Sequence, residues 1–295
     1  MKNVFIYSAI GTPLDENDGL STDGLQAQLE DHAEAGIDGL LVAGTMGCMP
    51  LLTAGTYADL AIKSVEYWRG RGELLVGVGD LSFARTRERL RLCNELKIDG
   101  VVALTPFFLS YSQAELIQYF QALASESRLP LYLYDLPQRT GIPLEIETVE
   151  RLAQHPNIAG IKCSGDLGQT RRLIDLLAAP DFRVVVAQAP LMDILIRSGV
   201  RDYVDGVYCI VPKLVRGIAD AAVAGDWATS NRRTQVLNGL LSMLRKYGVF
   251  PATTALLNHR GIPGNFAPRP HMPLSPERRE ELLAEPETIA ALAAA

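Results

Sequence analysis

The sequence predicts an α/β protein that folds as a closed (β/α)8 (TIM) barrel with a C-terminal helical extension. Short runs rich in Val, Ile and Leu recur about every 25 to 30 residues, and a longer amphipathic stretch follows each of them. The runs are apolar almost throughout, which is typical of parallel strands covered on both faces. No Gly-x-Gly-x-x-Gly motif opens a helix after an early strand, so the alternative of an open doubly wound sheet has less support.

Eight apolar runs are predicted to be the barrel strands. They cover residues 4–11, 37–44, 73–80, 99–106, 130–137, 158–165, 182–189 and 204–211. Helices are expected between them, for instance over residues 22–35 and 112–127. Ser21, Thr53 and Ser112 stand where helix N-caps are needed. Eight strand–helix units in series favour a closed barrel.

The barrel is predicted to occupy residues 1–225, and residues 226–295 are predicted to pack on it as the helical extension. The pattern of residues 231–247 is helical. Prolines at positions 251, 263, 268, 270 and 273 indicate that rigid turns join the helices that follow.

Charge and cysteine usage disfavour several classes of protein. The 28 Lys and Arg against 34 Asp and Glu give a net charge of -6, which disfavours a nucleic-acid binder. The 4 cysteines are too irregularly spaced for a disulfide framework. No apolar stretch reaches the roughly 18 residues of a membrane span. Since the first residues do not read as a signal peptide, we expect a cytoplasmic protein.

Lys162 interrupts the apolar run of the predicted sixth strand. Lysine is almost never fully buried without a partner, and the chemistry of (β/α)8 barrels lies at the C-terminal ends of the strands. The side chain either reaches water from the strand end or serves as a Schiff-base lysine. Burial favours a neutral amine, which can attack a ketone and form an imine without a metal.

Tyr134 stands at the corresponding place in the predicted fifth strand. It shares a face with Tyr132 and lies nearer the C-terminal end of the strand. A phenol there could pass protons to and from an imine intermediate. The alternative is an amphipathic barrel residue whose hydroxyl has a structural partner.

The predicted second strand runs into Gly44-Thr45-Met46-Gly47-Cys48. Backbone N–H groups of such a turn, together with the Thr45 hydroxyl, could hold a carboxylate at the start of the next helix. A plain strand-to-helix turn explains the same residues equally well.

These segments together resemble the family of dihydrodipicolinate synthase and N-acetylneuraminate lyase, the pyruvate-type class I aldolases. Residues 44–48 resemble the family's Gly-Thr-Thr-Gly-Glu motif, and Gly160-Ile161-Lys162 resembles its Gly-Ile-Lys motif. The Tyr-x-x-Pro-x-Arg-Thr-Gly motif is met in full by Tyr134, Pro137, Arg139, Thr140 and Gly141. The motifs occur in the family's order, and a helical C-terminal part is also typical of the family.

The resemblance implies catalytic roles and a covalent mechanism. Lys162 would form the imine and Tyr134 would relay protons, with no cofactor besides that covalent imine. The substrate would be a small 2-oxo acid such as pyruvate, and nucleic acid or membrane partners are not expected. Family members are usually tetramers, so we expect a homo-oligomer, either a tetramer or a dimer.

The resemblance also implies substrate-binding residues. Thr45, with the amides of Met46 and Gly47, would bind the carboxylate of the keto acid. Arg139 would anchor the far end of the substrate. The segment Gly206-Val207-Tyr208 resembles the part of the eighth strand that lines the pyruvate pocket, so Tyr208 is the last predicted substrate-binding residue.

Departures from the family motifs bear on the reaction. Met46 stands for the second threonine, Cys48 for the glutamate, and Phe107-Phe108 for the tyrosine pair of the synthases. In the synthase branch the second of those tyrosines reaches a neighbouring subunit and shares a hydroxyl relay with the threonine and the strand-five tyrosine. Met46 and Phe108 cannot donate a proton. We therefore expect a lyase that cleaves or dehydrates a 2-oxo acid such as a keto-deoxy sugar acid, with dihydrodipicolinate synthase as the alternative.

Two other classes of protein have weaker support. The four histidines, His32, His155, His259 and His271, show no metal-ligand spacing, so the sequence predicts no metal site. A non-catalytic binding or regulatory barrel would explain why relay hydroxyls are missing. The retained lysine and tyrosine at the strand ends argue against that alternative.

Overall fold

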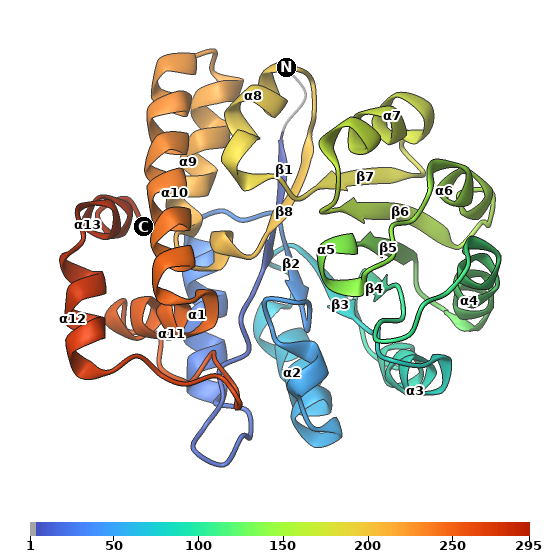
Figure 1. Cartoon of the computed structure of the whole chain (residues 1–295), viewed down its shortest axis with the longest axis horizontal. Helices are drawn as coiled ribbons and strands as arrows, with labels where there is room; N and C mark the ends of the chain where they lie inside the picture. The colour runs from blue at the N-terminus through green and yellow to red at the C-terminus, as the bar shows by residue number, and fades with distance from the viewer. Residues whose placement is uncertain (1–3) are drawn as a thin grey trace. The chain divides into compact units, whose positions relative to one another are not determined.

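A computed structural model describes residues 4–295, and it confirms eight parallel strands in the order β1 to β8 of a closed barrel (Figure 1). The strands are β1 Phe5–Ala9, β2 Gly39–Val42, β3 Glu73–Gly77, β4 Gly100–Leu104, β5 Leu131–Asp135, β6 Ile158–Cys163, β7 Arg183–Val186 and β8 Asp202–Asp205. The first seven lie inside the predicted runs, and the last residues of each run belong to the following loop or short helix.

The eighth strand differs from the prediction, which began it at residue 204. It begins at Asp202 and ends at Asp205, and the apolar residues that follow form the short 3-10 helix η3 (Val207–Cys209). Val207 N donates to the Asp205 carboxylate over 3.1 Å, which turns the chain at this point. The residues after Gly206 are apolar because they are buried, not because they extend the strand.

Several of the helices begin at a residue whose side chain caps the first turn. The helices are α1 Thr22–Glu34, α2 Ala54–Trp68, α3 Phe83–Cys93, α4 Gln113–Glu126, α5 Pro137–Thr140, α6 Ile146–Leu152, α7 Leu167–Leu177, α8 Met192–Arg197, α9 Pro212–Val223, α10 Trp227–Tyr247, α11 Val249–His259, α12 Pro276–Ala284 and α13 Pro286–Leu292, with 3-10 helices η1 Met49–Leu51 and η2 Ala189–Leu191. Ser21, Thr53 and Ser112 cap α1, α2 and α4, as predicted. Within residues 4–295 no helix is long and apolar enough to cross a membrane.

The chain forms two compact units, one of residues 73–187 and one of the residues before and after them. In the unit of residues 73–187, β3 to β7 pair in sequence order, with α3 against α4, α4 against α6 and α6 against α7 (Figure 1). The strands are largely apolar, apart from Glu73 and Arg183, which begin β3 and β7 and pair with each other, and the polar residues near the ends of β5 and β6.

The other unit contains β1, β2 and β8 and the C-terminal helices. The long helix α10 confirms the helical pattern predicted for residues 231–247, and it packs against α8, α9, α11 and α13 (Figure 1). Its buried leucines Leu237 and Leu240 lie on one side, at the spacing of an amphipathic helix. The helices after residue 226 therefore share a core with α8 and α9.

Candidate active site

Lys162 and Tyr134 lie side by side at the C-terminal ends of β6 and β5. The strand register pairs the two residues, and Lys162 Nζ lies 4.1 Å from the centroid of the Tyr134 ring. The lysine side chain is only 7% exposed. Within residues 4–295 no carboxylate forms an ion pair with Lys162. An amine that is buried against an aromatic ring and has no counter-ion is disfavoured unless it serves a function.

Glycines on the neighbouring strands make room for the aromatic row that leads to this pair. Tyr132 lies two residues before Tyr134 on the same face of β5. A Cβ atom at Gly160 would lie 2.9 Å from the Tyr132 ring, and one at Gly100 would lie 3.2 Å from it. The Tyr132 ring therefore lies across the glycines of β4 and β6, and Tyr134 and Lys162 follow toward the strand ends.

Arg139 lies on the short helix α5, directly after β5. Leu136 and Pro137 open this helix, and Gly141 ends it with a φ of 76°. The Arg139 side chain is exposed, and in the described part of the chain its guanidinium has no hydrogen bond or ion pair. The cation is therefore available to an anionic ligand.

Asp135 is a buried carboxyl group that the sequence analysis missed. It follows Tyr134, is 5% exposed, and its Oδ1 accepts a hydrogen bond from Leu144 N over 3.0 Å. Burial raises the pKa of Asp135 to about 6, and the Leu144 N–H opposes this shift. The signal was an acidic residue inside a buried strand, which needs the same explanation as a lysine there.

The turn after β2 carries Thr45, Met46 and Gly47 within the other unit. The Thr12 hydroxyl donates to Gly47 O over 2.7 Å, and Cys48 N donates to Thr45 O over 3.1 Å. Among the described residues, Met46 N and Gly47 N donate no hydrogen bond. Two backbone donors without partners in a tight turn are suited to an anion.

Met46 and Tyr208 are both packed inside that same unit. A Cβ atom at Gly206 would lie 3.0 Å from Met46 Sδ, so the methionine side chain lies against the backbone after β8. Tyr208 is fully buried, and its hydroxyl donates to Met192 Sδ over 3.6 Å. Burial raises the pKa of Tyr208 well above its ordinary value. The Tyr208 side chain is therefore part of the core.

Cysteine and metal chemistry find little support in residues 4–295. All four cysteines are buried and form no disulfide, and burial raises the pKa of both Cys48 and Cys163 to about 12. The two thiols act as packing groups. The described chain has no cluster of three or more His, Cys, Asp or Glu residues that could hold a metal ion.

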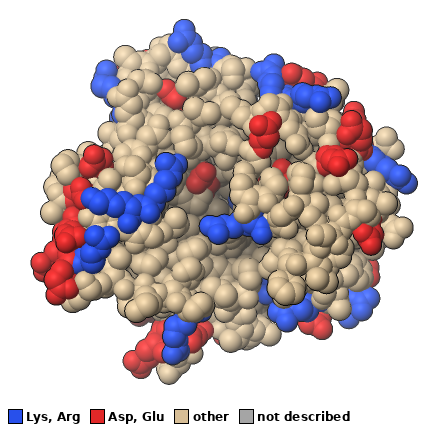
Figure 2. All heavy atoms as spheres, viewed as in Figure 1, with Lys and Arg blue, Asp and Glu red and all other residues tan. Residues whose placement is uncertain are grey.

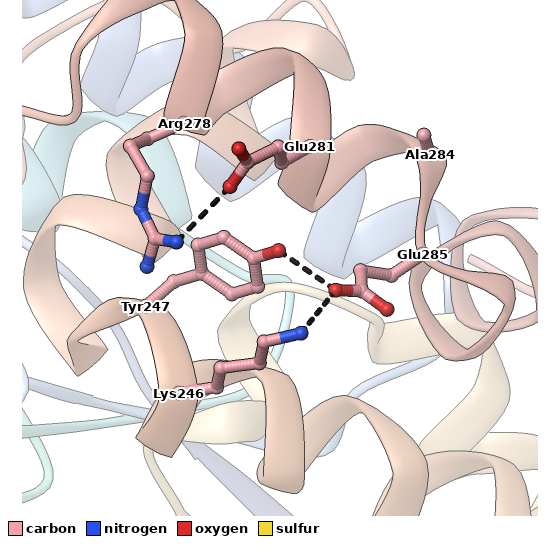
Figure 3. A pocket seen from close by; sticks show the side chains of 6 residues that line it. All are labelled: Lys246, Tyr247, Arg278, Glu281, Ala284 and Glu285. Atoms are coloured by element: carbon pink, nitrogen blue, oxygen red, sulfur yellow. Dashed lines mark hydrogen bonds and ion pairs between the residues drawn. The ribbon is translucent and has the colours of Figure 1, made fainter.

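A separate cavity of about 360 Å³ lies among the C-terminal helices (Figure 3). It is lined by Lys246, Tyr247, Arg278, Glu281, Ala284 and Glu285. Glu285 accepts hydrogen bonds from Lys246 and Tyr247, and Arg278 pairs with Glu281 over 3.0 Å. Basic and acidic side chains also alternate over these helices on the face that Figure 2 shows. The two basic and two acidic side chains that line the cavity neutralise one another. We therefore interpret the cavity as part of the packing of α10 against the last helices.

A (β/α)8 barrel with a buried lysine and a tyrosine at its strand ends defines the class I aldolase type of lyase. The chain belongs to the Dihydrodipicolinate synthetase family, which matches residues 3–288. Members of this family are lyases of the class I aldolase type that act on carbon–carbon and carbon–oxygen bonds. The family predicted from the motifs is thus confirmed.

Relatives of two named activities are similar to this chain. It is 33% identical to a 4-hydroxy-tetrahydrodipicolinate synthase of Stenotrophomonas maltophilia, over 92% of this chain and 91% of the relative. It is 32% identical to an N-acetylneuraminate lyase of Rhizobium meliloti, over 92% and 90% of the two chains. The family match therefore spans both a synthase and a lyase.

Solved structures of synthases are similar over nearly the whole chain. The synthase of Acinetobacter baumannii complexed with pyruvate is 26% identical, with a TM-score of 0.87 over 100% of both chains. The synthase of Methylacidiphilum fumariolicum SolV is 25% identical, with a TM-score of 0.88 over 99% of this chain and 98% of that one.

Proposed function

We propose that this protein cleaves or dehydrates a 2-oxo acid, such as a keto-deoxy sugar acid, through an imine at Lys162. The observation that carries the proposal is the buried Lys162 amine, which lies 4.1 Å from the Tyr134 ring and has no carboxylate partner in residues 4–295. The pyruvate complex of the Acinetobacter baumannii relative supports a 2-oxo acid as the substrate class.

The reaction follows from the chemistry of a lysine amine. Lys162 Nζ attacks the ketone carbon, and the resulting carbinolamine loses water to give an iminium ion. In cleavage, the bond between the α- and β-carbons of the former ketone breaks, its electron pair forms the enamine double bond and neutralises the iminium nitrogen, and the β-hydroxyl group loses its proton as the aldehyde leaves. Tyr134 passes protons to the resulting enamine, and hydrolysis then releases pyruvate and the free amine.

We assign substrate binding to the remaining predicted residues. Thr45 and the N–H groups of Met46 and Gly47 bind the carboxylate of the keto acid, supported by two backbone donors that have no partner in the described chain. Arg139 binds the far end of the substrate, supported by its exposed and unpaired guanidinium. Only the backbone of Tyr208 takes part, because its side chain is buried.

Borohydride trapping tests the imine. The protein is incubated with pyruvate, reduced, digested and mapped by mass spectrometry. We expect a pyruvyl adduct on the Lys162 peptide that is absent in Lys162→Ala and present in Lys213→Ala, since Lys213 is an exposed lysine on α9. An unmodified Lys162 peptide in the wild-type protein would overturn the proposal.

A synthase reaction is the second candidate, because 4-hydroxy-tetrahydrodipicolinate synthases are frequent among the relatives. The missing hydroxyls at Met46 and Phe108 oppose it. A panel of keto-deoxy sugar acids, N-acetylneuraminate, and pyruvate with aspartate semialdehyde separates the reactions. Turnover of the last pair at a rate above all others would establish the synthase instead.

Two substitutions test whether those missing hydroxyls set the reaction. The double variant Met46→Thr with Phe108→Tyr regains both groups, and we expect its turnover of pyruvate with aspartate semialdehyde to rise at least about tenfold. Steady-state kinetics of this variant and of the two single variants check the prediction. Equal turnover in all four proteins would show that the hydroxyls do not decide the reaction.

We also propose that the protein is a homo-oligomer, either a tetramer or a dimer. Phe108 is 90% exposed in the loop after β4, and Leu109 beside it is also exposed. By resemblance this loop lies at a subunit interface in the family. Analytical ultracentrifugation tests the proposal, with Phe108→Asp expected to shift the protein toward smaller species. A monomeric wild-type protein would contradict it.

A further inference from the structure

The loop that carries Arg139 is closed by a buried carboxylate. Residues 136–144 leave β5 directly after Asp135 and return to it, where Leu144 N donates to Asp135 Oδ1 over 3.0 Å. Gly165 leaves space for the carboxylate, since a Cβ atom there would lie 2.8 Å from Asp135 Oδ2. One side chain thus joins the first and last residues of the loop.

The other contacts of this loop are neutral hydrogen bonds. Gln169 Nε2 donates to Leu144 O over 2.5 Å, and Gln113 Nε2 donates to Pro143 O over 2.9 Å. Gln138 Nε2 donates to Ser164 O over 3.0 Å. Among the described side chains that hold this loop by these hydrogen bonds, Asp135 is therefore the ionisable one. The strength of its hydrogen bond to Leu144 N depends on its charge.

The surroundings of Asp135 contain no compensating cation. From β6, the register places Cys163 opposite Asp135, and burial keeps that thiol neutral. From α7, the Asp166 carboxylate is turned to its own helix, where it accepts from Gln169 N. Arg139 of α5 and Glu145 before α6 are exposed. Within residues 4–295 no lysine or arginine pairs with Asp135, and burial raises its pKa to about 6.

We propose that Asp135 is a positioning residue whose ionised carboxylate holds the 136–144 loop, and with it Arg139, in place for the far end of the substrate. The Leu144 N–H favours the ionised carboxylate, so protonation of Asp135 replaces a charge-assisted hydrogen bond by a weaker neutral one. This loosens the loop while the carboxyl group itself stays buried beside Gly165, so the gain in global stability on protonation is retained. The binding of substrates with a distal anion then weakens, while the binding of pyruvate, which has none, does not. The part that concerns Arg139 rests on the proposed function.

Imine trapping with two probes isolates this effect. Pyruvate and 2-oxoglutarate are titrated at pH 5.5 and 7.5 with cyanoborohydride, and the half-saturating concentration of each is measured. The ratio of the two concentrations cancels the pH dependence of imine formation itself. We expect the 2-oxoglutarate to pyruvate ratio to rise about fivefold at the lower pH.

Variants show which side chain is responsible. In Asp135→Asn the ratio should be high at both pH values, because the amide cannot ionise. Arg139→Ala should raise the ratio at both pH values as well. Asp175→Asn, which changes an exposed carboxylate on α7, should behave as the wild-type protein does. A ratio in the wild-type protein that does not change with pH, or an unaltered profile in Asp135→Asn, would overturn the proposal.

Hydrogen exchange tests the loop without any substrate. After correction for intrinsic exchange, the peptide covering residues 136–144 should exchange faster at pH 5.5 than at pH 7.5 in the wild-type protein. In Asp135→Asn it should be equally fast at both. Equal exchange in both proteins at both pH values would refute the role of Asp135 in the loop. A missing Lys162 adduct would instead refute the proposed function alone.

Discussion

At the scale of single residues, a buried amine distinguishes Lys162 from its neighbours on β6. A lysine in the core is disfavoured unless a partner or a function compensates, and here its neighbour is the Tyr134 ring. The flanking residues Ile161 and Cys163 are packing groups on the same strand. The contrast with these neighbours supports the proposed reactive role of Lys162.

Tyr134→Phe should retain the imine and lose turnover. Because the phenol moves protons and does not form the covalent bond, we expect kcat to fall by about 10² to 10⁴ while the pyruvyl adduct on Lys162 still forms. Borohydride trapping and steady-state kinetics on one preparation check this result. Tyr132→Phe, on the same face of β5, serves as the control. Full activity of Tyr134→Phe would exclude the relay role.

At the scale of elements, helix caps determine where helices begin, and strand glycines leave room for aromatic side chains. Ser112 and Glu115 form a reciprocal capping box at the start of α4. Gly160 admits the Tyr132 ring beside it. Both features act locally. Substitutions at them should therefore change the free energy of unfolding more than they change the catalytic rate.

Ser112→Ala should lower the free energy of unfolding by about 1 kcal/mol, because the first turn of α4 loses its side-chain acceptor. Urea denaturation measures this change. Ser112→Asp, which can still accept from Glu115 N, should lose less. An Ala variant as stable as the wild-type protein would show that water replaces the cap.

Gly160→Ala should be more damaging, with a loss of about 1 to 3 kcal/mol from overpacking. The added methyl group would lie 2.9 Å from the Tyr132 ring and even closer to Arg183 O. Combining it with Tyr132→Leu should recover part of the loss, since the leucine leaves the ring position empty. Additive effects of the two substitutions would contradict this contact.

At the scale of the whole molecule, two buried groups give the stability opposite pH dependences. His32 lies between Ser8 Oγ at 2.9 Å and Gln28 O at 2.7 Å, and burial lowers its pKa from 6.5 to about 4. The unfolded chain therefore binds the proton first, and stability is lost as the pH falls from 6.5 to 4. Burial raises the pKa of Asp135 from 3.8 to about 6, so its contribution increases over pH 6 to 4.

Each group contributes about 3 kcal/mol across its window, so the two largely offset each other in the wild-type protein. In Asp135→Asn, the stability relative to wild type should therefore fall on acidification from pH 7 to 4. In His32→Gln it should rise over the same range. Denaturant unfolding at four pH values checks both signs. Parallel profiles for the three proteins would show that neither group titrates as its burial requires.

Seven of the eight strands could be predicted because hydrophobic period and length are local properties of the sequence. The eighth strand is present, but its predicted bounds were wrong because burial makes the residues after Gly206 apolar without extending them. Lys162 and Tyr134 could be found because a polar residue at a strand end stands out in an apolar run. Asp135 was missed although it stands out in the same way.

The sequence by itself determined the family and the barrel, since these follow from motif order and hydrophobic period, and it singled out Lys162 as a candidate because its polarity conflicts with its strand. Only the tertiary structure decided that Lys162 lies against Tyr134 with no carboxylate partner among the described residues, that Met46 packs on Gly206, and that Asp135 closes the loop of Arg139. These contacts join residues that are far apart in the sequence, or the two ends of a loop that returns to its own strand. The physical reason is that burial and pairing depend on register and packing, which local sequence does not encode.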